Sequence, residues 1–498
     1  MQFAHLVVFE PQLKFCHALI VHPRGTCGGV IPIPFPPYPL TPQPVTYAED
    51  ANIPASTLRS DVDNATLLLT QPPLFVGTQT GSPTPFVAAA GSGATITTAG
   101  AGYSAGQPLV LSGSIPSPLS GGTTYYASGV SGQLFGLATT SGGSAVTLTS
   151  GGFGTATTIQ FLVSGSIPTP LNIDTTVTDP WAGHLTTSNI PTYYALFPGY
   201  YLCEMQAPLE YTGGTGCVSV AIEGQEGVGP QTTYGGQCMP NSATSSRYPQ
   251  PSVAKLLAFS VAGSYGAPAN NYVQGAVYQD SGSQQQALIT TTRFPQIQVQ
   301  WVAALTGTAG LPVPDNDTWA APPQVVSSTF VNKNIRDTIN FLSYVPICEA
   351  YYSAGTQTLA SQSGLPGGGS TVSLDTAYID TYSAFNATTH TWTAPVPGTY
   401  LCYGQAPVTG GSGAVSVDCG LTVHSKNYNG GTVITVWGGA QVASTSASQV
   451  NCGNVRRLLR LNAGDTVQLA AYQNGATNPV LPSAGIWQSR LITIWRTG

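Results

Sequence analysis

An imperfect internal repeat is the feature that most constrains the fold of this chain. The stretch TWTAPVPGTYLCYGQAPVTGGSGAVSV at residues 391–417 has an edited copy, LFPGYYLCEMQAPLEYTGGTGCVSV, at residues 196–220. In both copies a Pro-Gly pair precedes a short apolar run, followed by Gln-Ala-Pro, a Gly-rich turn and Val-Ser-Val. Because proline fixes φ and glycine accepts positive φ, such a pair marks the turn before a strand. The repeated unit is therefore predicted to be a β-hairpin.

Composition extends this prediction to the whole chain. The 498 residues include 58 Gly and 40 Pro but only 14 Lys plus Arg and 20 Asp plus Glu. Helix surfaces need charged side chains, whereas short strands joined by many turns need glycine, proline and β-branched residues. The length corresponds to about three domains. We therefore predict an all-β chain with several domains.

Charge and hydropathy exclude several functional classes. The net charge is −6 and no basic stripe occurs, which argues against binding to a nucleic-acid backbone. No apolar run approaches the length of a membrane span, and the N-terminus lacks the features of a signal peptide. Synthesis and folding in the cytoplasm of a host cell are expected. The nine cysteines are too sparse for a disulfide framework and are interpreted as small buried hydrophobic residues.

The N-terminal 47 residues differ from the rest. The segment IPIPFPPYPLTPQP at 31–44 favours an extended polyproline conformation, so residues 1–47 are predicted to form an arm that packs against a partner. Histidine and cysteine residues gather here, and zinc binding is the alternative to an ordinary packed or interface role. Their spacing matches no zinc-ligand pattern, so no metal site is predicted; these residues are His5, Cys16, His17, His22 and Cys27.

Two segments show helical periodicity. Residues 53–73 and 325–346 each carry apolar positions at the spacing of a narrow coiled-coil seam, and each ends at proline. Short helices of this kind must dock on something, either a symmetry axis or their own domain. The candidate trimer-interface residues are Leu58, Val62, Ala65, Leu69, Val331, Ile335, Thr338 and Leu342.

Residues 84–165 form a separate turn-rich β segment. Strands are expected at 108–111, 123–127, 133–138 and 145–148, separated by Gly-Ser or Gly-Gly turns. The sequence resembles a small β module found in phage tail fibres and related virion proteins.

Two longer units, 166–304 and 371–498, surround the repeated hairpins. The second unit resembles the C1q/TNF-like jelly roll, whose signature is an aromatic-Ala-Pro-Pro-Gly-Tyr turn followed by Leu-x-Leu and a Gly-Asp pair. The matching residues are Trp392, Pro395, Pro397, Gly398, Tyr400, Leu459, Leu461, Gly464, Asp465, Val467 and Leu469. The first unit is a divergent copy that keeps Leu257 and Val273, lacks the Gly-Asp pair, and matches Trp301 to Trp495. The resemblance implies tight homotrimers.

A third resemblance concerns the segment around Asn334 to Leu342. It is similar to a segment of minor tail proteins of actinobacterial phages, where it also precedes a C1q-like domain. Together the resemblances imply a tailed-phage virion protein with two jelly rolls stacked outward along a three-fold axis. The expected organisation is an attachment arm (1–47), helix and linker (48–83), β module (84–165), divergent jelly roll (166–304), linker with helix (305–370) and C-terminal jelly roll (371–498).

Candidate chemistry is sparse. A GxSxG pattern at 102–106 lacks the strand-turn-helix context of a nucleophile elbow. The pairs Asp174 with Asp179 and Asp375 with Asp380 leave a calcium role open, although ordinary solvation is preferred. No catalytic residue and no cofactor are predicted, and the chain is not expected to be an enzyme.

The predicted function is therefore structural. We expect a homotrimeric minor tail or tail-tip and fibre protein of the virion, with a tail position favoured over the capsid, bound to other virion proteins through residues 1–47. Two alternatives stay open: a capsid decoration or head-fibre protein, and a host-recognition protein that binds a cell-wall glycan. The 24 tyrosines suit either subunit interfaces or sugar stacking.

Overall fold

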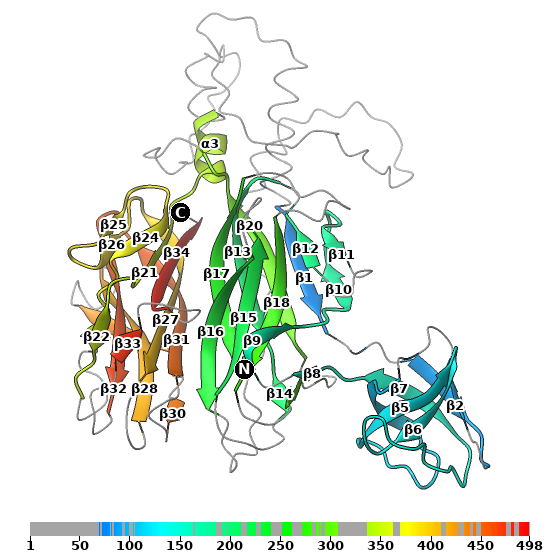
Figure 1. Ribbon diagram of the computed structural model, residues 1–498. Helices are drawn as coiled ribbons and strands as arrows, with labels where there is room; N and C mark the ends of the chain where they lie inside the picture. The colour runs from blue at the N-terminus through cyan, green and yellow to red at the C-terminus, as the bar shows by residue number, and fades with distance from the viewer. Residues whose placement is uncertain are drawn as a thin grey trace, which may run out of the picture.

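The computed structural model describes residues 69–306 and 336–497, with gaps at many loop tips. The predicted N-terminal arm lies outside the described residues. Strands form almost all of the regular structure, as Figure 1 shows, so the prediction of an all-β fold is confirmed. The strands build two β-sandwiches and one small barrel.

The second sandwich has the strand order of a jelly roll. One of its two sheets, named the β27 sheet, runs β22-β33-β27-β34-β21-β24, with β31 also paired to β27. These strands are β21 (Ile347–Tyr351), β22 (Thr356–Thr358), β24 (Thr376–Asp380), β27 (Gly398–Thr409), β31 (Val450–Leu461), β33 (Val480–Pro482) and β34 (Arg490–Thr497). The facing sheet contains β23 (Ser370–Thr371), β25 (Phe385–Asn386), β26 (Thr391–Thr393), β28 (Val415–His424), β29 (Ile434–Trp437), β30 (Val442–Ser444) and β32 (Thr466–Gln473).

The first sandwich repeats this topology. Its β13 sheet runs β10-β1-β20-β13-β17, formed by β1 (Leu74–Thr78), β10 (Thr175–Thr178), β13 (Gly199–Gln206), β17 (Ser252–Phe259) and β20 (Gln296–Ala303). The facing sheet contains β9 (Gly165–Pro170), β11 (His184–Leu185), β12 (Thr192–Tyr194), β15 (Cys217–Gln225), β16 (Thr232–Pro240) and β18 (Tyr272–Gln279). A minor sheet joins β8 (Phe161–Leu162), β14 (Leu209–Glu210) and β19 (Gln285–Ala287).

The β module is a closed six-stranded barrel with its own core. The strands follow the order β2-β3-β6-β5-β4-β7, and buried Phe86, Ile96, Leu109 and Phe135 lie inside. They are β2 (Thr84–Ala88), β3 (Ile96–Thr98), β4 (Pro108–Ser114), β5 (Thr124–Ser131), β6 (Leu134–Ala138) and β7 (Gly152–Thr158). The strand expected at 145–148 is instead a loop with one isolated bridge, between Gly91 and Leu148.

The jelly-roll boundaries differ from those expected. Strand β1 precedes the barrel, yet it pairs with β20 through Leu74 opposite Gln300, so the barrel is inserted inside the first jelly roll between β1 and β10. Strand β21 likewise lies in the stretch assigned to a linker, at 305–370, but pairs with β34. Both strands were missed because their partners lie far away in sequence. The jelly rolls therefore begin at β1 and β21, rather than at residues 166 and 371.

The described parts of the two predicted helices pack within this chain. Helix α3 (Thr338–Ser343) buries Phe341 edge-on against Trp495, with ring centroids 4.9 Å apart. Leu342 is partly buried against the core of the second jelly roll, and Leu69 against the core of the first. Five candidates lie outside the described residues: Leu58, Val62, Ala65, Val331 and Ile335. A role for these helices at a symmetry axis stays a prediction.

In the described part of the chain, α3 is too short to cross a membrane, and no other helix there is long and apolar enough to do so.

Candidate functional site: the interface between the two jelly rolls

The jelly-roll signature residues hold one end of the second sandwich together. Trp392 and Tyr400 are fully buried and meet edge to face with ring centroids 5.0 Å apart. The Tyr400 hydroxyl donates to the Val396 carbonyl at 2.7 Å, and Trp495 Nε1 donates to the Pro397 carbonyl at 3.3 Å. These contacts fix the turn that leads into β27 at Gly398, so this part of the signature is structural.

The Gly-Asp pair closes a turn at the same end. Gly464 has φ +88°, a conformation that favours glycine, and its N–H donates to the Ala394 carbonyl at 2.9 Å. The Asp465 carboxylate accepts hydrogen bonds from the Ser425 hydroxyl and from the Asn462 N–H. Val467 is fully buried in the next strand.

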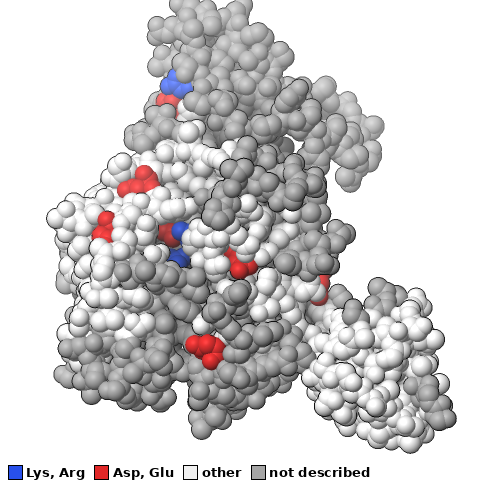
Figure 2. All heavy atoms as spheres, in the orientation of Figure 1, with Lys and Arg blue, Asp and Glu red and all other residues white. Residues whose placement is uncertain are grey.

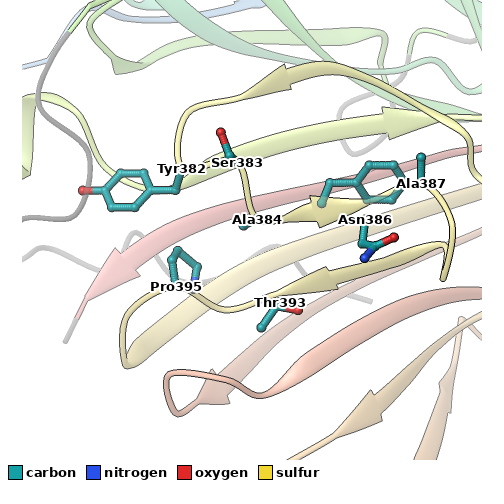
Figure 3. Close-up of a pocket in the computed structure, with 8 residues that line it drawn as sticks. Tyr382, Ser383, Ala384, Asn386, Ala387, Thr393 and Pro395 are labelled. Carbon is teal, nitrogen blue, oxygen red and sulfur yellow. The ribbon is translucent and has the colours of Figure 1, made fainter.

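A shallow pocket of about 600 Å³ opens beside this turn (Figure 3). No Asp, Glu, His, Lys or Arg lines it; the lining residues are Tyr382, Ser383, Ala384, Phe385, Asn386, Ala387, Thr393 and Pro395. Burial raises the pKa of Tyr382 to about 12, and the neighbouring Tyr344 contributes a smaller part of this rise. The Tyr382 hydroxyl therefore stays protonated at neutral pH. The pocket therefore offers apolar contact and hydrogen bonds, but no acid-base pair.

The four aspartates that are candidates for calcium, Asp174, Asp179, Asp375 and Asp380, hold backbone turns at equivalent places in the two jelly rolls. Asp174 accepts the Gly81 N–H at 2.9 Å, and Asp375 accepts the Ala354 N–H at 2.8 Å. Asp179 accepts a hydrogen bond from the His184 N–H at 2.7 Å, and Asp380 accepts one from the Phe385 N–H at 2.8 Å. Among the described residues, no group of three or more His, Cys, Asp or Glu is placed to hold a metal ion.

The most distinctive chemistry lies between the two jelly rolls, where a charged pair is buried. Lys255 on β17 of the first jelly roll contacts Glu349 on β21 of the second, with Nζ 2.7 Å from Oε1. Only 4% of Lys255 and 1% of Glu349 are exposed. The second carboxylate oxygen accepts the Leu256 N–H at 2.9 Å. One glutamate thus binds both a side chain and the backbone of the neighbouring jelly roll.

Aromatic rings complete the surroundings of the lysine. Lys255 Nζ lies 4.6 Å from the ring centroid of Tyr234 on β16 and 3.9 Å from that of Tyr378 on β24. A desolvated cation gains about 2 kcal/mol from such a ring. The two tyrosines come from different jelly rolls, so the lysine links both.

A second buried cation lies next to the pair. Arg490 on β34 has Nη1 3.9 Å from Glu349 Oε1, and its Nη2 donates to the Gly235 carbonyl on β16 at 3.5 Å. Gln405 Nε2 on β27 donates to the same carbonyl at 3.2 Å. The β16–β17 edge of the first jelly roll therefore rests on the β27 sheet of the second.

Polar contacts continue along the rim of this interface. Arg456 pairs with Glu204 at 3.1 Å, and Asn454 donates to Ser252 at 2.8 Å. The apolar part is continuous with the core of the second jelly roll, whose cluster includes five residues of the first: Leu202, Ala254, Leu256, Val302 and Ala303. The two jelly rolls lie side by side in Figure 1, instead of being stacked end to end as expected.

Sequence analysis did not single out Lys255, Glu349 or Arg490. Lys255 and Glu349 are each the only charge in an otherwise largely apolar strand, and Arg490 begins the largely apolar strand β34. Charged residues are almost never fully buried unless they are paired, so that pattern could have identified them.

Two solved structures are similar to parts of this chain. No family model matches it, and no curated protein matches at a significant level. Among solved structures, the globular domain of a zebrafish complement C1qA protein is 17% identical, matched over 31% of this chain and 100% of that domain, with a TM-score of 0.22. Murine APRIL is 11% identical, matched over 30% of this chain and 98% of its own, with a TM-score of 0.21. The assignment of two jelly rolls rests on the strand order of the two sandwiches.

Proposed function

We propose that this chain is a structural subunit of a tailed-phage virion, a homotrimeric minor tail or tail-tip and fibre protein without enzymatic activity. The observation that carries the proposal is the buried interface between the jelly rolls. Three of the few charged residues of the chain hold the two sandwiches together: Lys255, Glu349 and Arg490. Such use of charge suits a protein whose work is assembly. The resemblances of residues 84–165 and 334–342 to phage virion proteins support the proposal that the chain is part of a phage particle.

Mass and position test this proposal. Light scattering coupled to size-exclusion chromatography should give three times the chain mass of 51.3 kDa at micromolar concentration. Immunogold labelling of phage particles should place the protein on the tail, and deletion of residues 1–47 should abolish incorporation while the trimer persists. Label on the capsid would favour a decoration or head-fibre protein. A chain absent from particles would contradict the virion assignment.

A second candidate function, recognition of a neutral host glycan, is favoured by the surface of the barrel. Residues 64–173 contain no Asp, Glu, Lys, Arg or His, and the barrel lobe is free of coloured spheres on the face shown in Figure 2. Phe153 lies opposite Val87 on neighbouring strands, and they are 67% and 65% exposed. Hydroxyl groups of Ser112 and Thr155 lie on neighbouring strands.

Binding to purified host cell wall tests this candidate. Wild-type protein should sediment with the cell wall, and Phe153→Ala should reduce the bound fraction by about tenfold, as expected for loss of an aromatic contact. Equal binding by both proteins would exclude the exposed ring as the contact.

A further inference from the structure

The shallow pocket of the second jelly roll lies over the short ladder of β25 and β26, outside the sandwich core. Asn386 lies opposite Thr391 in this ladder, next to the buried Trp392. Successive side chains of a strand point to opposite faces of its sheet, so Asn386 and Thr393 share the outer face, away from Trp392. In Figure 3 the Asn386 side chain extends towards the strand that carries Thr393. The outer face of the ladder therefore brings two polar side chains to one pocket.

Both side chains keep hydrogen-bonding capacity that the chain does not use. Asn386 Oδ1 accepts the Thr388 N–H at 2.9 Å and the Thr389 N–H at 3.1 Å. Since an oxygen must accept these two bonds, the amide nitrogen Nδ2 is the free end of Asn386. In the described part of the chain, neither this nitrogen nor the Thr393 hydroxyl has a hydrogen-bond partner. The pocket thus offers one donor and one group that can both donate and accept.

The remaining walls are apolar or uncharged. Tyr382 and Pro395 line the pocket, and the Tyr382 ring stacks on Tyr344 with ring centroids 6.3 Å apart. The carboxylate of Asp380 holds the adjoining loop, because it accepts the N–H groups of residues 384 and 385 at 3.0 and 2.8 Å. A negative charge in this place disfavours an anionic ligand, and no lysine or arginine lines the pocket to attract one. The pocket therefore suits an uncharged ligand.

The first jelly roll has the same backbone at the equivalent place but a different lining. Strand register places Leu185 where the second jelly roll has Asn386, and Tyr194 where it has Thr393. The N–H groups of Tyr194 and Thr393 each donate to the carbonyl group just before the partner strand, at 2.9 and 3.0 Å. The ladder thus forms without the Asn386 amide and the Thr393 hydroxyl, so the fold does not require these two groups.

We propose that this pocket binds a neutral sugar ring, with Asn386 Nδ2 and Thr393 Oγ1 as its hydrogen-bonding groups. Tyr382 and Pro395 contact the apolar face of the sugar. A pyranose carries hydroxyl groups around its edge and C–H groups on its faces, so it matches polar groups set beside apolar walls. The volume of about 600 Å³ lies within the range of about 300–1,000 Å³ of small-ligand sites. The site adds sugar recognition to the proposed structural role and does not depend on the barrel contact at Phe153.

Saturation-transfer difference NMR on the full chain tests the proposal. The probes are the methyl glycosides of glucose, galactose, mannose and N-acetylglucosamine, with methyl glucuronide as the charged comparison. At least one neutral probe should receive saturation with a dissociation constant of about 1 mM, as expected for a shallow site with two hydrogen bonds. The glucuronide should bind more weakly than glucoside. Absence of transfer to every neutral probe would overturn the proposal, and so would stronger binding of the glucuronide.

Two variants remove the hydrogen-bonding groups separately. Thr393→Val removes the hydroxyl at constant shape, and Asn386→Ser removes the amide nitrogen but keeps an oxygen for the Thr388 and Thr389 N–H groups. Each variant should weaken sugar binding by about fivefold, the effect of one lost hydrogen bond. Thr388→Ala is the matched control, because this exposed residue lies on the same hairpin outside the pocket, and it should bind the sugar as wild type does. Far-UV circular dichroism should show that all three variants are folded.

Phe153→Ala separates this site from the barrel. If saturation is lost in Phe153→Ala but kept in Thr393→Val and Asn386→Ser, the sugar binds to the barrel and the inference is wrong. Equal binding by wild type and both pocket variants would place the sugar elsewhere and contradict the inference as well. Neither result changes the proposed homotrimer, which light scattering measures independently.

Discussion

Lys255 Nζ lies 2.7 Å from Glu349 Oε1 across the boundary between the two jelly rolls, and both side chains are almost completely buried. Desolvation of two charges offsets much of their attraction, so the pair itself adds little net stability. Removal of one partner is different, because the other charge is then buried without compensation.

Glu349→Leu is therefore expected to destabilise the packing of the two jelly rolls by about 3–5 kcal/mol, since it leaves Lys255 unpaired and removes the acceptor of the Leu256 N–H. Adding Lys255→Met to this variant should restore part of the loss. Urea unfolding of the single and double variants measures both changes. If the double variant is no more stable than Glu349→Leu, the buried lysine charge is not the cause.

The glycine of the Pro-Gly turn in the first jelly roll, Gly199, is required for a steric reason. Gly199 has φ +155°, and a Cβ atom there would lie 2.1 Å from Trp301 Nε1. Gly199→Ala should lower the unfolding free energy by about 2–4 kcal/mol, from backbone strain together with overpacking. Gly132→Ala in the barrel is the control, because φ is +60° but no atom lies within 4 Å. Thermal unfolding should show the larger loss for Gly199→Ala; equal losses would mean that strain alone acts.

Local sequence chemistry was sufficient to predict the turns of the jelly rolls, but the predicted hairpin is wrong, because β27 and β28 lie in different sheets, as do β13 and β15. The Pro-Gly and Gly-Asp turns are encoded by residues next to one another, and Gly398, Tyr400 and Gly464 hold the places expected of them. Strand β1 could not be found in this way, because Leu74 pairs with Gln300 across the inserted barrel. The five residues of β1, LFVGT, do not alternate between apolar and polar side chains, so the sequence does not distinguish this strand from a loop.

The candidate site was harder to predict for a related reason. Lys255 and Glu349 are 94 residues apart and meet only because two separately folded sandwiches pack together. No spacing rule in the sequence connects these two residues. Packing between units depends on surfaces rather than on sequence motifs.

The barrel should be removable from the first jelly roll. Its two connections meet at its base, where the Thr158 N–H donates to the Gly81 carbonyl at 3.1 Å and Asp174 holds the Gly81 N–H at 2.9 Å. Replacing residues 82–157 with two glycines should leave β1 paired with β10 and β20, because the ends are already in contact. Circular dichroism and light scattering should show a folded protein in the same oligomeric state as wild type. Aggregation of the excised chain would mean that the barrel supports the sandwich.

His184 should make the first jelly roll sensitive to acid. Its ring lies 4.4 Å from the Phe75 ring centroid, its Nδ1 is 2.8 Å from Thr176 Oγ1, and its Nε2 is buried without a hydrogen-bond partner. Burial lowers the pKa of His184 from the usual 6.5, although Asp179, the Ile173 backbone and Asp174 act in the opposite direction. The folded protein thus keeps the ring neutral at a pH where the unfolded chain has already taken up a proton.

Stability should consequently be full above pH 6.5 and decline as the pH falls from there towards the lower pKa of the folded state. The urea concentration at which half of the first jelly roll is unfolded should be lower at pH 5.5 than at pH 7.5. Hydrogen exchange of β11 and β12 measures this midpoint. His184→Phe is the matched variant, since Phe385 occupies the equivalent place in the second jelly roll and also donates its N–H to an aspartate. This variant should lose the pH dependence contributed by the imidazole. An unchanged difference between the two pH values in His184→Phe would assign the acid sensitivity to other groups.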